Sequence, residues 1–99
     1  MELGTILITM KSLLFVPGNR KKMLNKALHL NPNILVPDLE DSIPDSEKTN
    51  ARNMVASILP YLAEKGSPII PRVNPLDSDL LKEDLIALVG PHIFGVSVG

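Results

Sequence analysis

The sequence predicts an α/β fold in which short parallel strands alternate with helices. Its main evidence is a set of short apolar runs, each of the first three followed by a segment whose apolar residues repeat with helical spacing. Alternation of this kind is typical of a parallel sheet whose strands are joined by right-handed helical crossovers. Polar residues follow the first three runs, where parallel strands present ligand-binding side chains. The predicted strands are residues 12–16, 34–36, 67–73 and 93–98.

The first unit pairs a strand with a basic helix. Ser12 to Val16 reads SLLFV, a continuous apolar run that predicts a strand buried on both faces and ended by Pro17-Gly18. The next residues, 19–30, read NRKKMLNKALHL and predict an amphipathic helix with Asn19 as its N-cap. The apolar face of this helix is predicted to contain Met23, Leu24, Ala27 and Leu28.

The second unit delivers acidic residues to the end of its strand. Residues 34–36 are apolar and lead directly into Asp38-Leu39-Glu40-Asp41. After Pro44, either Asp45 or Ser46 is predicted to cap a longer helix that ends near Gly66. Proline in a helix interior removes a hydrogen bond, so Pro60 is predicted to kink or split it. The helix-spaced apolar residues are Ala51, Met54, Val55, Ile58 and Leu62.

The last units are less regular. Residues 67–73 read SPIIPRV and predict a third strand, weakened because its two prolines have no N–H to donate to the sheet. Leucines at helical spacing predict a short third helix from Leu80 to Leu88, stopped by Gly90-Pro91. The apolar run 93–98 predicts a fourth strand.

Composition excludes several classes of function. A net charge of −1 gives no whole-surface attraction to nucleic acid or to an anionic membrane. The absence of cysteine excludes disulfides, thiolate metal ligands and a cysteine nucleophile. No apolar stretch approaches the roughly 20 residues of a membrane helix, and the start has neither a basic region nor a cleavage site of a secretion signal. We expect a cytoplasmic protein that does not span a membrane.

The acidic cluster has two interpretations. Asp38, Glu40 and Asp41 could hold a divalent cation directly or through its waters, or they could cap a solvated turn. Strand alternation places Asp38 and Glu40 on the same side, with Asp41 in the following loop.

Arg72 occupies a strand position where an apolar residue is expected. Its guanidinium could bind a carboxylate or a carbonyl oxygen through two parallel hydrogen bonds, or it could form a structural ion pair with the acidic cluster. The two roles are compatible, because an arginine held by acids is preorganised for a ligand.

The basic start of the first helix is also open to two interpretations. Cations there favour an anionic ligand such as phosphate, although for any one lysine an ordinary solvated helix face is the stronger interpretation. These cations are Arg20, Lys21, Lys22 and Lys26. His29 and His92 have no second ligand at metal spacing and are predicted to be structural. Pro17-Gly18 lacks the spacing of a dinucleotide or nucleoside-triphosphate loop, which disfavours that chemistry.

Three ordered strings resemble the citrate lyase beta-subunit and malyl-CoA lyase family. They are residues 12–20 (SLLFVPGNR), 38–43 (DLEDSI) and 72–77 (RVNPLD). The resemblance covers nearly the whole chain from Lys11 and implies a (β/α)8 barrel. Residues 12–99 would then be an incomplete lyase domain holding about the first four strands, after an N-terminal extension at 1–11. Because a complete barrel takes about 250 residues, we expect a fragment or a truncated product.

The resemblance implies a magnesium-dependent carbon–carbon lyase of the aldolase or Claisen type. Its substrate would be a CoA or acyl-carrier thioester such as citryl-CoA or malyl-CoA. By this resemblance Arg72 would be catalytic and would bind the oxo acid, while Glu40 and Asp41 would line the magnesium and substrate pocket. The positions implied to contact the CoA portion are Phe15, Arg20 and Lys26.

The resemblance also implies that the Glu and Asp ligands of Mg2+ lie beyond Gly99, so no metal ligand is predicted within the chain. It further implies a homo-oligomer, a trimer or hexamer, and possible association with other lyase subunits. Two alternatives stay open. One is a non-catalytic remnant or interaction module of the same fold, and the other is an unrelated flavodoxin-like binding domain.

Overall fold

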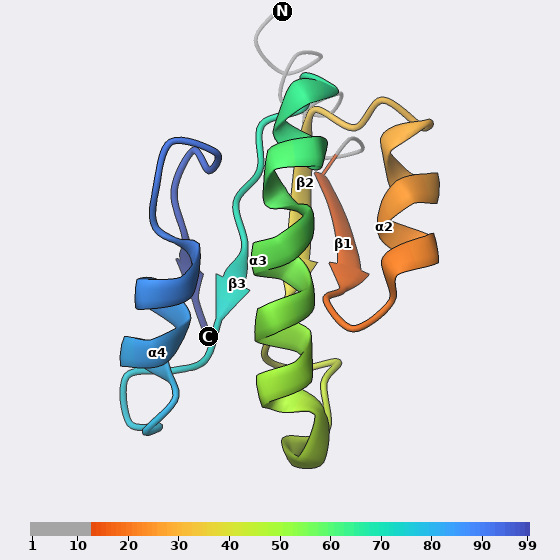
Figure 1. Cartoon of the computed structure of the whole chain (residues 1–99). Helices are drawn as coiled ribbons and strands as arrows, with labels where there is room; N and C mark the ends of the chain where they lie inside the picture. The colour runs from red at the N-terminus through yellow and green to blue at the C-terminus, as the bar shows by residue number, and fades with distance from the viewer. Residues whose placement is uncertain (1–12) are drawn as a thin grey trace, which may run out of the picture.

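The computed structural model describes residues 13–99. Predictions for the extension at 1–11 and for Ser12 therefore lie outside the described residues. The elements alternate as the sequence predicts, with one additional 3-10 turn before the long helix (Figure 1). In chain order they are β1 (Leu13–Pro17), α2 (Lys21–Leu28), β2 (Ile34–Asp38), η1 (Asp45–Glu47), α3 (Lys48–Glu64), β3 (Arg72–Val73), α4 (Leu81–Leu88) and β4 (Ser97–Val98).

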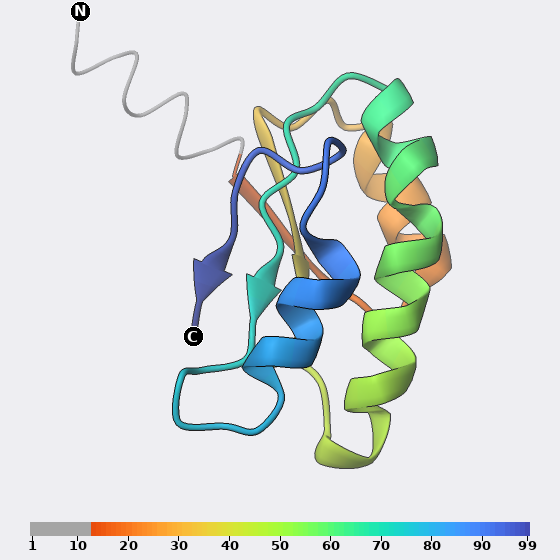
Figure 2. The same cartoon turned by 60° about the vertical axis from the view of Figure 1, so that its left-hand side comes forward.

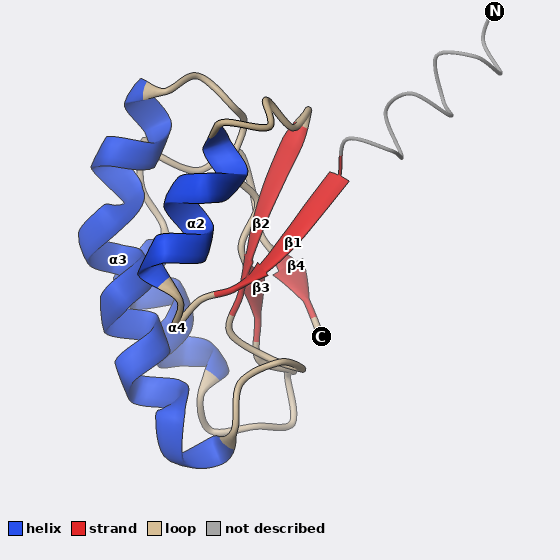
Figure 3. Cartoon of the chain, turned by 90° about the vertical axis from the view of Figure 1, so that its right-hand side faces the viewer, coloured by secondary structure: helices blue, strands red, loops and turns tan. Residues whose placement is uncertain are grey.

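The strands form one parallel sheet in the order β1-β2-β3-β4. All three helices lie on one face of this sheet, and within the described residues no helix covers the other face (Figure 3). A strand sends alternate side chains to opposite faces. Each strand therefore presents one set of residues to the helices and one set to the uncovered face.

The hydrophobic core lies between the sheet and the helices. Leu35 of β2 and Val73 of β3 are fully buried against Leu24 of α2 and against Val55 and Leu62 of α3. Burial of one such side chain contributes roughly 1.5–3 kcal/mol. Because Val73 belongs to this core, strand alternation directs its neighbour Arg72 to the uncovered face.

The predicted burial of the first strand on both faces is wrong. Of the apolar residues in β1, only Val16 is buried, whereas Leu13 and Phe15 expose 40% and 49% of their surfaces. These two alternate with Val16 and so belong to the face that the helices leave uncovered. The Phe15 ring is consequently available to the side chains at the ends of the strands.

The predicted N-caps are also wrong. Helix α2 begins at Lys21 with Arg20 at the N-cap position, and no side chain caps it. Asn19 instead lies in the turn closed by the Arg20 N–H, which donates to Pro17 O at 3.1 Å. Asp45 and Ser46 form η1, a 3-10 turn, and α3 follows it without a side-chain cap.

Two helix predictions need correction. Helix α3 runs unbroken from Lys48 to Glu64 through Pro60, so the proline does not split it. Pro60 is exposed, and its missing N–H removes one hydrogen bond from the helix without ending it. Met23, predicted on the buried face of α2, is largely exposed, while Leu24, Ala27 and Leu28 are buried as predicted.

Prolines shorten the third and fourth strands. The predicted run 67–73 forms the two-residue strand β3 and an isolated bridge between Ile69 and Leu35. Pro68 and Pro71 still accept sheet hydrogen bonds through their carbonyls, from Leu35 N and Ser97 N, but have no N–H to return. The fourth strand is likewise shorter than predicted, at Ser97–Val98. None of the helices in the described part of the chain combines the length and apolar character needed to cross a membrane.

Candidate functional site

The site forms where the strands end on the uncovered face of the sheet. The strand register places Pro17, Asp38, Arg72 and Ser97 side by side across the four strands. In Figure 2 the strand arrows end close together at the side of the molecule where the long loops begin. Carboxyl ends of parallel strands are the usual location of ligand sites in α/β proteins.

Asp38 and Arg72 form a two-pronged ion pair at this edge. Arg72 Nε donates to Asp38 Oδ1 at 2.8 Å, and Arg72 Nη2 donates to Asp38 Oδ2 at 2.9 Å. The geometry is the parallel fork that makes arginine–carboxylate pairs strong. Asp38 is 2% exposed, so the carboxylate is the buried anchor of the pair.

Asp38 also organises the loop that follows β2. Its Oδ1 accepts a hydrogen bond from Glu40 N, and its Oδ2 accepts from both the N–H and the hydroxyl of Ser42. Burial by itself would raise the pKa of this carboxyl, but the hydrogen bonds from Arg72, Ser42 and Glu40 together hold the pKa well below its usual range. Asp38 is thus ionised throughout the neutral range.

Arg72 has a second, more open environment. Its guanidinium carbon lies 5.0 Å from the centroid of the Phe15 ring, and its Nε lies 3.7 Å from Glu40 Oε1. The hydrogen bond to Asp38 raises the pKa of the arginine, and the charges of Asp38, Glu40 and Asp41 act in the same direction. A quarter of the Arg72 side chain remains exposed, so the cation is fixed in direction but still reachable from solvent.

Gly18 lets the first loop approach the end of β2. Its N–H donates to Asp38 O at 2.8 Å. A Cβ at this position would lie 2.8 Å from Asp38 O and 2.9 Å from a Val55 methyl, closer than real Cβ atoms come. A side chain here would push the loop away from Asp38. The Pro17-Gly18 pair was predicted as a strand terminator, and its packing role was missed.

The structure brings together some of the predicted site residues. Phe15, Glu40 and Arg72 meet around Asp38 as described above. Lys26 is exposed on α2 and, with Phe15, lines an apolar groove of about 400 Å³ beside β1. Asp41 is exposed in the loop after β2, and Arg20 is exposed at the start of α2. The other groove residues are Leu14, Val16, Met23, Ala27 and Leu30.

Comparison with known proteins identifies the family. The model of the HpcH/HpaI aldolase/citrate lyase family matches residues 11–98. The chain belongs to this family. It is 39% identical over 79 residues to the citrate lyase subunit beta of Haemophilus influenzae, covering 80% of this chain and 27% of that protein. It is 35% identical over 81 residues to a (3S)-malyl-CoA thioesterase of Cereibacter sphaeroides, covering 81% of this chain and 28% of the relative.

A solved structure of the same family supports the fold. The chain is similar to protein CitE of Mycobacterium tuberculosis, in complex with magnesium, acetoacetate and coenzyme A, with a TM-score of 0.65 and 26% identity. The match covers 85% of this chain and 30% of that one. The chain therefore spans between a quarter and a third of the length of these proteins. The described strands correspond to part of a TIM-barrel-like α/β fold, as the sequence predicted.

The acids of this lyase-family chain do not form a complete magnesium site by themselves. Within residues 13–99, no three His, Asp or Glu side chains gather closely enough to hold a metal ion. Both Asp38 oxygens are already engaged by Arg72 and the loop N–H groups. Of the two interpretations of the acidic cluster, the structure supports the turn and the ion pair. We therefore assign no metal-dependent step to these residues.

A second buried polar cluster was missed by the sequence analysis. Arg52 Nε of α3 donates to Asp84 Oδ1 at 2.8 Å, and Arg52 Nη1 donates to Glu83 Oε2 at 3.1 Å. Asn74, just after β3, donates to Asp84 Oδ2 from its N–H at 3.0 Å and from its side-chain amide at 2.7 Å. One sequence signal was available, because Asp84 lies one helical turn before the buried Leu88.

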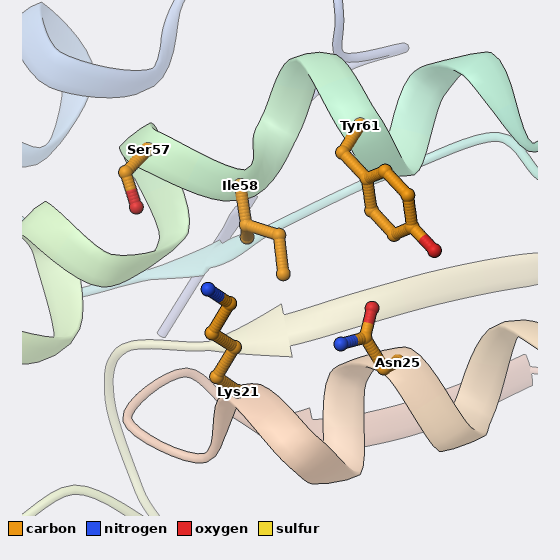
Figure 4. A pocket seen from close by; sticks show the side chains of 5 residues that line it. All are labelled: Lys21, Asn25, Ser57, Ile58 and Tyr61. Carbon is orange, nitrogen blue, oxygen red and sulfur yellow. The ribbon is translucent and has the colours of Figure 1, made fainter.

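A separate pocket lies between α2 and α3. Figure 4 shows Lys21 and Asn25 of α2 facing Ser57, Ile58 and Tyr61 of α3 around a space of about 310 Å³. Asn25 Oδ1 is buried here without a hydrogen-bond partner among the described residues. The pocket belongs to the helical layer, whereas Arg72 is on the uncovered face of the sheet. It takes no part in the site at the strand ends.

Proposed function

We propose that this chain supplies the oxo-acid-binding part of the site of a carbon–carbon lyase that acts on a CoA or acyl-carrier thioester. One observation supports the proposal above the others. Arg72 is held by two hydrogen bonds that it donates to a buried carboxylate and lies near an aromatic ring, yet it remains partly exposed at the carboxyl end of a parallel sheet. A fixed, reachable guanidinium is suited to an anionic, planar ligand.

The chemistry of such a cleavage explains the need for a fixed cation. In a retro-aldol step the carbon–carbon bond breaks, its electron pair passes to the thioester fragment as an enolate, and the hydroxyl oxygen becomes the carbonyl oxygen of the oxo acid. The hydroxyl passes its proton to a base or to solvent during the step, so negative charge develops on that oxygen, and the enolate carbon then takes up a proton to give the acyl thioester. Preorganised donors aimed at developing charge lower the barrier. The role of Arg72 is to hold the oxo-acid carboxylate and to stabilise this oxygen.

We assign the thioester portion of the substrate to the side of Phe15 that faces away from Arg72. Phe15 and Lys26 line the groove beside β1, which is apolar except for the lysine cation. Lys26 and Arg20 are suited to the phosphates of a CoA or carrier arm, because both cations are exposed. Glu40 and Asp41 are proposed to line the substrate pocket next to Arg72.

The metal ligands and the oligomeric assembly are proposed to involve groups outside the described residues. The M. tuberculosis protein was solved with magnesium, and for this chain we propose Mg2+ held by carboxylates outside residues 13–99. A trimeric or hexameric assembly is proposed on the family resemblance alone. A cytoplasmic location is proposed because the chain has no cysteine, which fits a reducing compartment. Citryl-CoA and malyl-CoA stand as equivalent candidate substrates.

A second candidate function is a non-catalytic module of the same fold. It is favoured by the engagement of both Asp38 oxygens within the chain, by Arg72 and by the N–H groups of Glu40 and Ser42. A module of this kind would keep the buried Asp38 anchor as a structural element, without a ligand at Arg72.

Titration with oxaloacetate distinguishes the two candidates. The 99-residue chain is compared with Arg72→Gln and with Lys82→Gln, a matched loss of one positive charge on the exposed surface of α4. The lyase proposal predicts saturable binding that Arg72→Gln weakens by about tenfold or more, as the loss of a charge-assisted hydrogen bond implies, and that Lys82→Gln preserves. Equal weakening by both variants contradicts it, and so does a native chain that binds neither oxaloacetate nor glyoxylate, the oxo acid released from malyl-CoA.

A further inference from the structure

We propose that Arg52 and Asp84 are positioning residues for Arg72 and act through Asn74. The inference deepens the proposed function, because it concerns the arginine assigned to the oxo acid. Neither residue lies on the uncovered face with Arg72: their contacts are with each other and with the chain just beyond β3.

The first step of the argument is that the sheet alone holds β3 weakly. The strand contains only Arg72 and Val73; it pairs with β2 at the single position Asp38–Arg72 and, on its other side, with the equally short β4. Pro71 precedes the strand and Pro75 follows it closely, and neither has an N–H to donate. Because so few sheet hydrogen bonds hold this strand, the backbone position of Arg72 also depends on the contacts of the residues that flank the strand.

The second step is that Asp84 fixes the chain on one of those sides. Asp84 Oδ2 accepts from both the backbone N–H and the side-chain amide of Asn74, two residues after Arg72. Asn74 and Asp84 are 2% and 0% exposed, so these hydrogen bonds do not compete with water. They secure the backbone at the point where it leaves the sheet.

The third step is that Arg52 fixes Asp84. Its Nε donates to Asp84 Oδ1, opposite the oxygen that Asn74 uses, while Nη1 reaches Glu83 at the surface. The cluster thus joins α3, α4 and the end of β3. An uncompensated carboxylate in this position would be costly, so the Arg52 cation offsets the burial of the carboxylate that accepts from Asn74.

A structural role alone would lower stability without changing Arg72 in the folded chain. The distinguishing readout is therefore hydrogen exchange of the Arg72 Nε–H, followed by NMR without ligand under conditions where each variant is folded. Asn74→Ala removes one hydrogen bond to Asp84 and leaves the Arg52–Asp84 pair in place. Asn53→Ala, on the exposed surface of α3, is the matched control.

The expected result is exchange at Arg72 about fivefold faster in Asn74→Ala than in the native chain, the factor that one lost hydrogen bond implies. Asn53→Ala should exchange at the native rate. Arg52→Lys, which keeps the charge but not the fork, provides a second variant and should also accelerate exchange. Native exchange at Arg72 in folded Asn74→Ala and Arg52→Lys overturns the inference.

The same samples separate this inference from the proposed function. Oxaloacetate is added to each, and its Kd should rise in Asn74→Ala together with the exchange rate at Arg72. If the native chain binds neither oxaloacetate nor glyoxylate while Asn74→Ala still accelerates exchange, the proposed function fails and the positioning role stands. If the native chain binds and the exchange rates are equal, the positioning role fails and the proposed function stands.

Discussion

Two arginine–aspartate pairs in this chain use the same chemistry in different surroundings. In the pair of Arg72 with Asp38, a quarter of the arginine side chain is exposed and the carboxylate is buried. In the pair of Arg52 with Asp84, both side chains are closed off, at 8% and 1% exposed. We propose that the first pair accepts a ligand while Asp38 holds the arginine, whereas the second pair joins the helices to the end of β3. The two pairs differ in their exposure to solvent and not in their chemistry.

The largest effect should follow from breaking the closed pair. Asp84→Ala leaves Arg52 buried without its carboxylate and should lower the free energy of unfolding by about 3–5 kcal/mol. Urea denaturation measures this loss. Glu83→Ala removes the exposed partner of the same arginine and should cost no more than about 1 kcal/mol. Equal losses in the two variants would show that burial does not distinguish them.

The second effect concerns the backbone approach that shapes the open pair. Gly18→Ala places a methyl group 2.8 Å from Asp38 O and should destabilise the chain by about 1–3 kcal/mol, as overpacking does. Gly90→Ala is the matched control, because a Cβ there meets nothing within 4 Å. Thermal unfolding of both variants tests the close approach, and a native melting temperature for Gly18→Ala would refute it.

A third, pH-dependent effect should come from Asp38. Above the ordinary carboxyl pKa of about 3.9, Asp38 is ionised in both the folded and the unfolded chain, and its stabilising contribution is fully present. Below that pH the unfolded chain takes up a proton while folded Asp38 stays ionised, because its folded pKa is depressed. The free energy of unfolding should therefore fall as the pH decreases through this acidic window.

Asp38→Asn isolates that contribution. Urea denaturation between about pH 5 and about pH 3, around the ordinary carboxyl pKa, should show a shallower decline for Asp38→Asn than for the native chain. Parallel slopes for the native chain and Asp38→Asn would mean that Asp38 is not held ionised by Arg72.

The smallest effect should come from the aromatic ring beside the open pair. Phe15→Leu keeps an apolar side chain on β1 but removes the ring whose centroid lies 5.0 Å from the Arg72 guanidinium. Binding of oxaloacetate should weaken by a factor equivalent to about 0.5–1 kcal/mol, the usual value for an exposed cation–π contact. Leu76→Ala, in the exposed loop after β3, is the control. Calorimetric titration compares the oxaloacetate affinity of the two variants. Equal weakening in Phe15→Leu and Leu76→Ala would contradict a specific contribution of the ring.

The sequence predicted the open pair better than the closed one. Arg72 and the acidic cluster Asp38, Glu40 and Asp41 lie at strand ends that the β/α alternation brings to one edge, so the pattern indicated that they meet without showing which acid pairs with the arginine. Arg52 and Asp84 meet across 31 intervening residues from two helices, and helical periodicity alone does not determine which helix faces pack together. Each pair consists of one arginine and one aspartate, so the sequence does not distinguish them. Only the packing shows that one pair is partly exposed and the other is buried.

The helix caps and the burial of the first strand could not be predicted from the sequence either. Element order and parallel pairing followed from periodicity and are confirmed. The caps assigned to Asn19, Asp45 and Ser46 failed because neighbouring turns satisfied the helix starts in another way. The assumed double-sided burial of the first strand failed because periodicity cannot tell which face of a sheet is covered.

Titration of the ¹⁵N-labelled chain with oxaloacetate, followed at the arginine side chains, tests the central claim most directly. The account predicts that the Arg72 guanidinium signals shift and saturate, while the Arg52 signals stay in place because that pair is closed. Saturable binding that leaves Arg72 unperturbed, or that shifts Arg52 instead, would contradict the assignment of the open pair as the oxo-acid site.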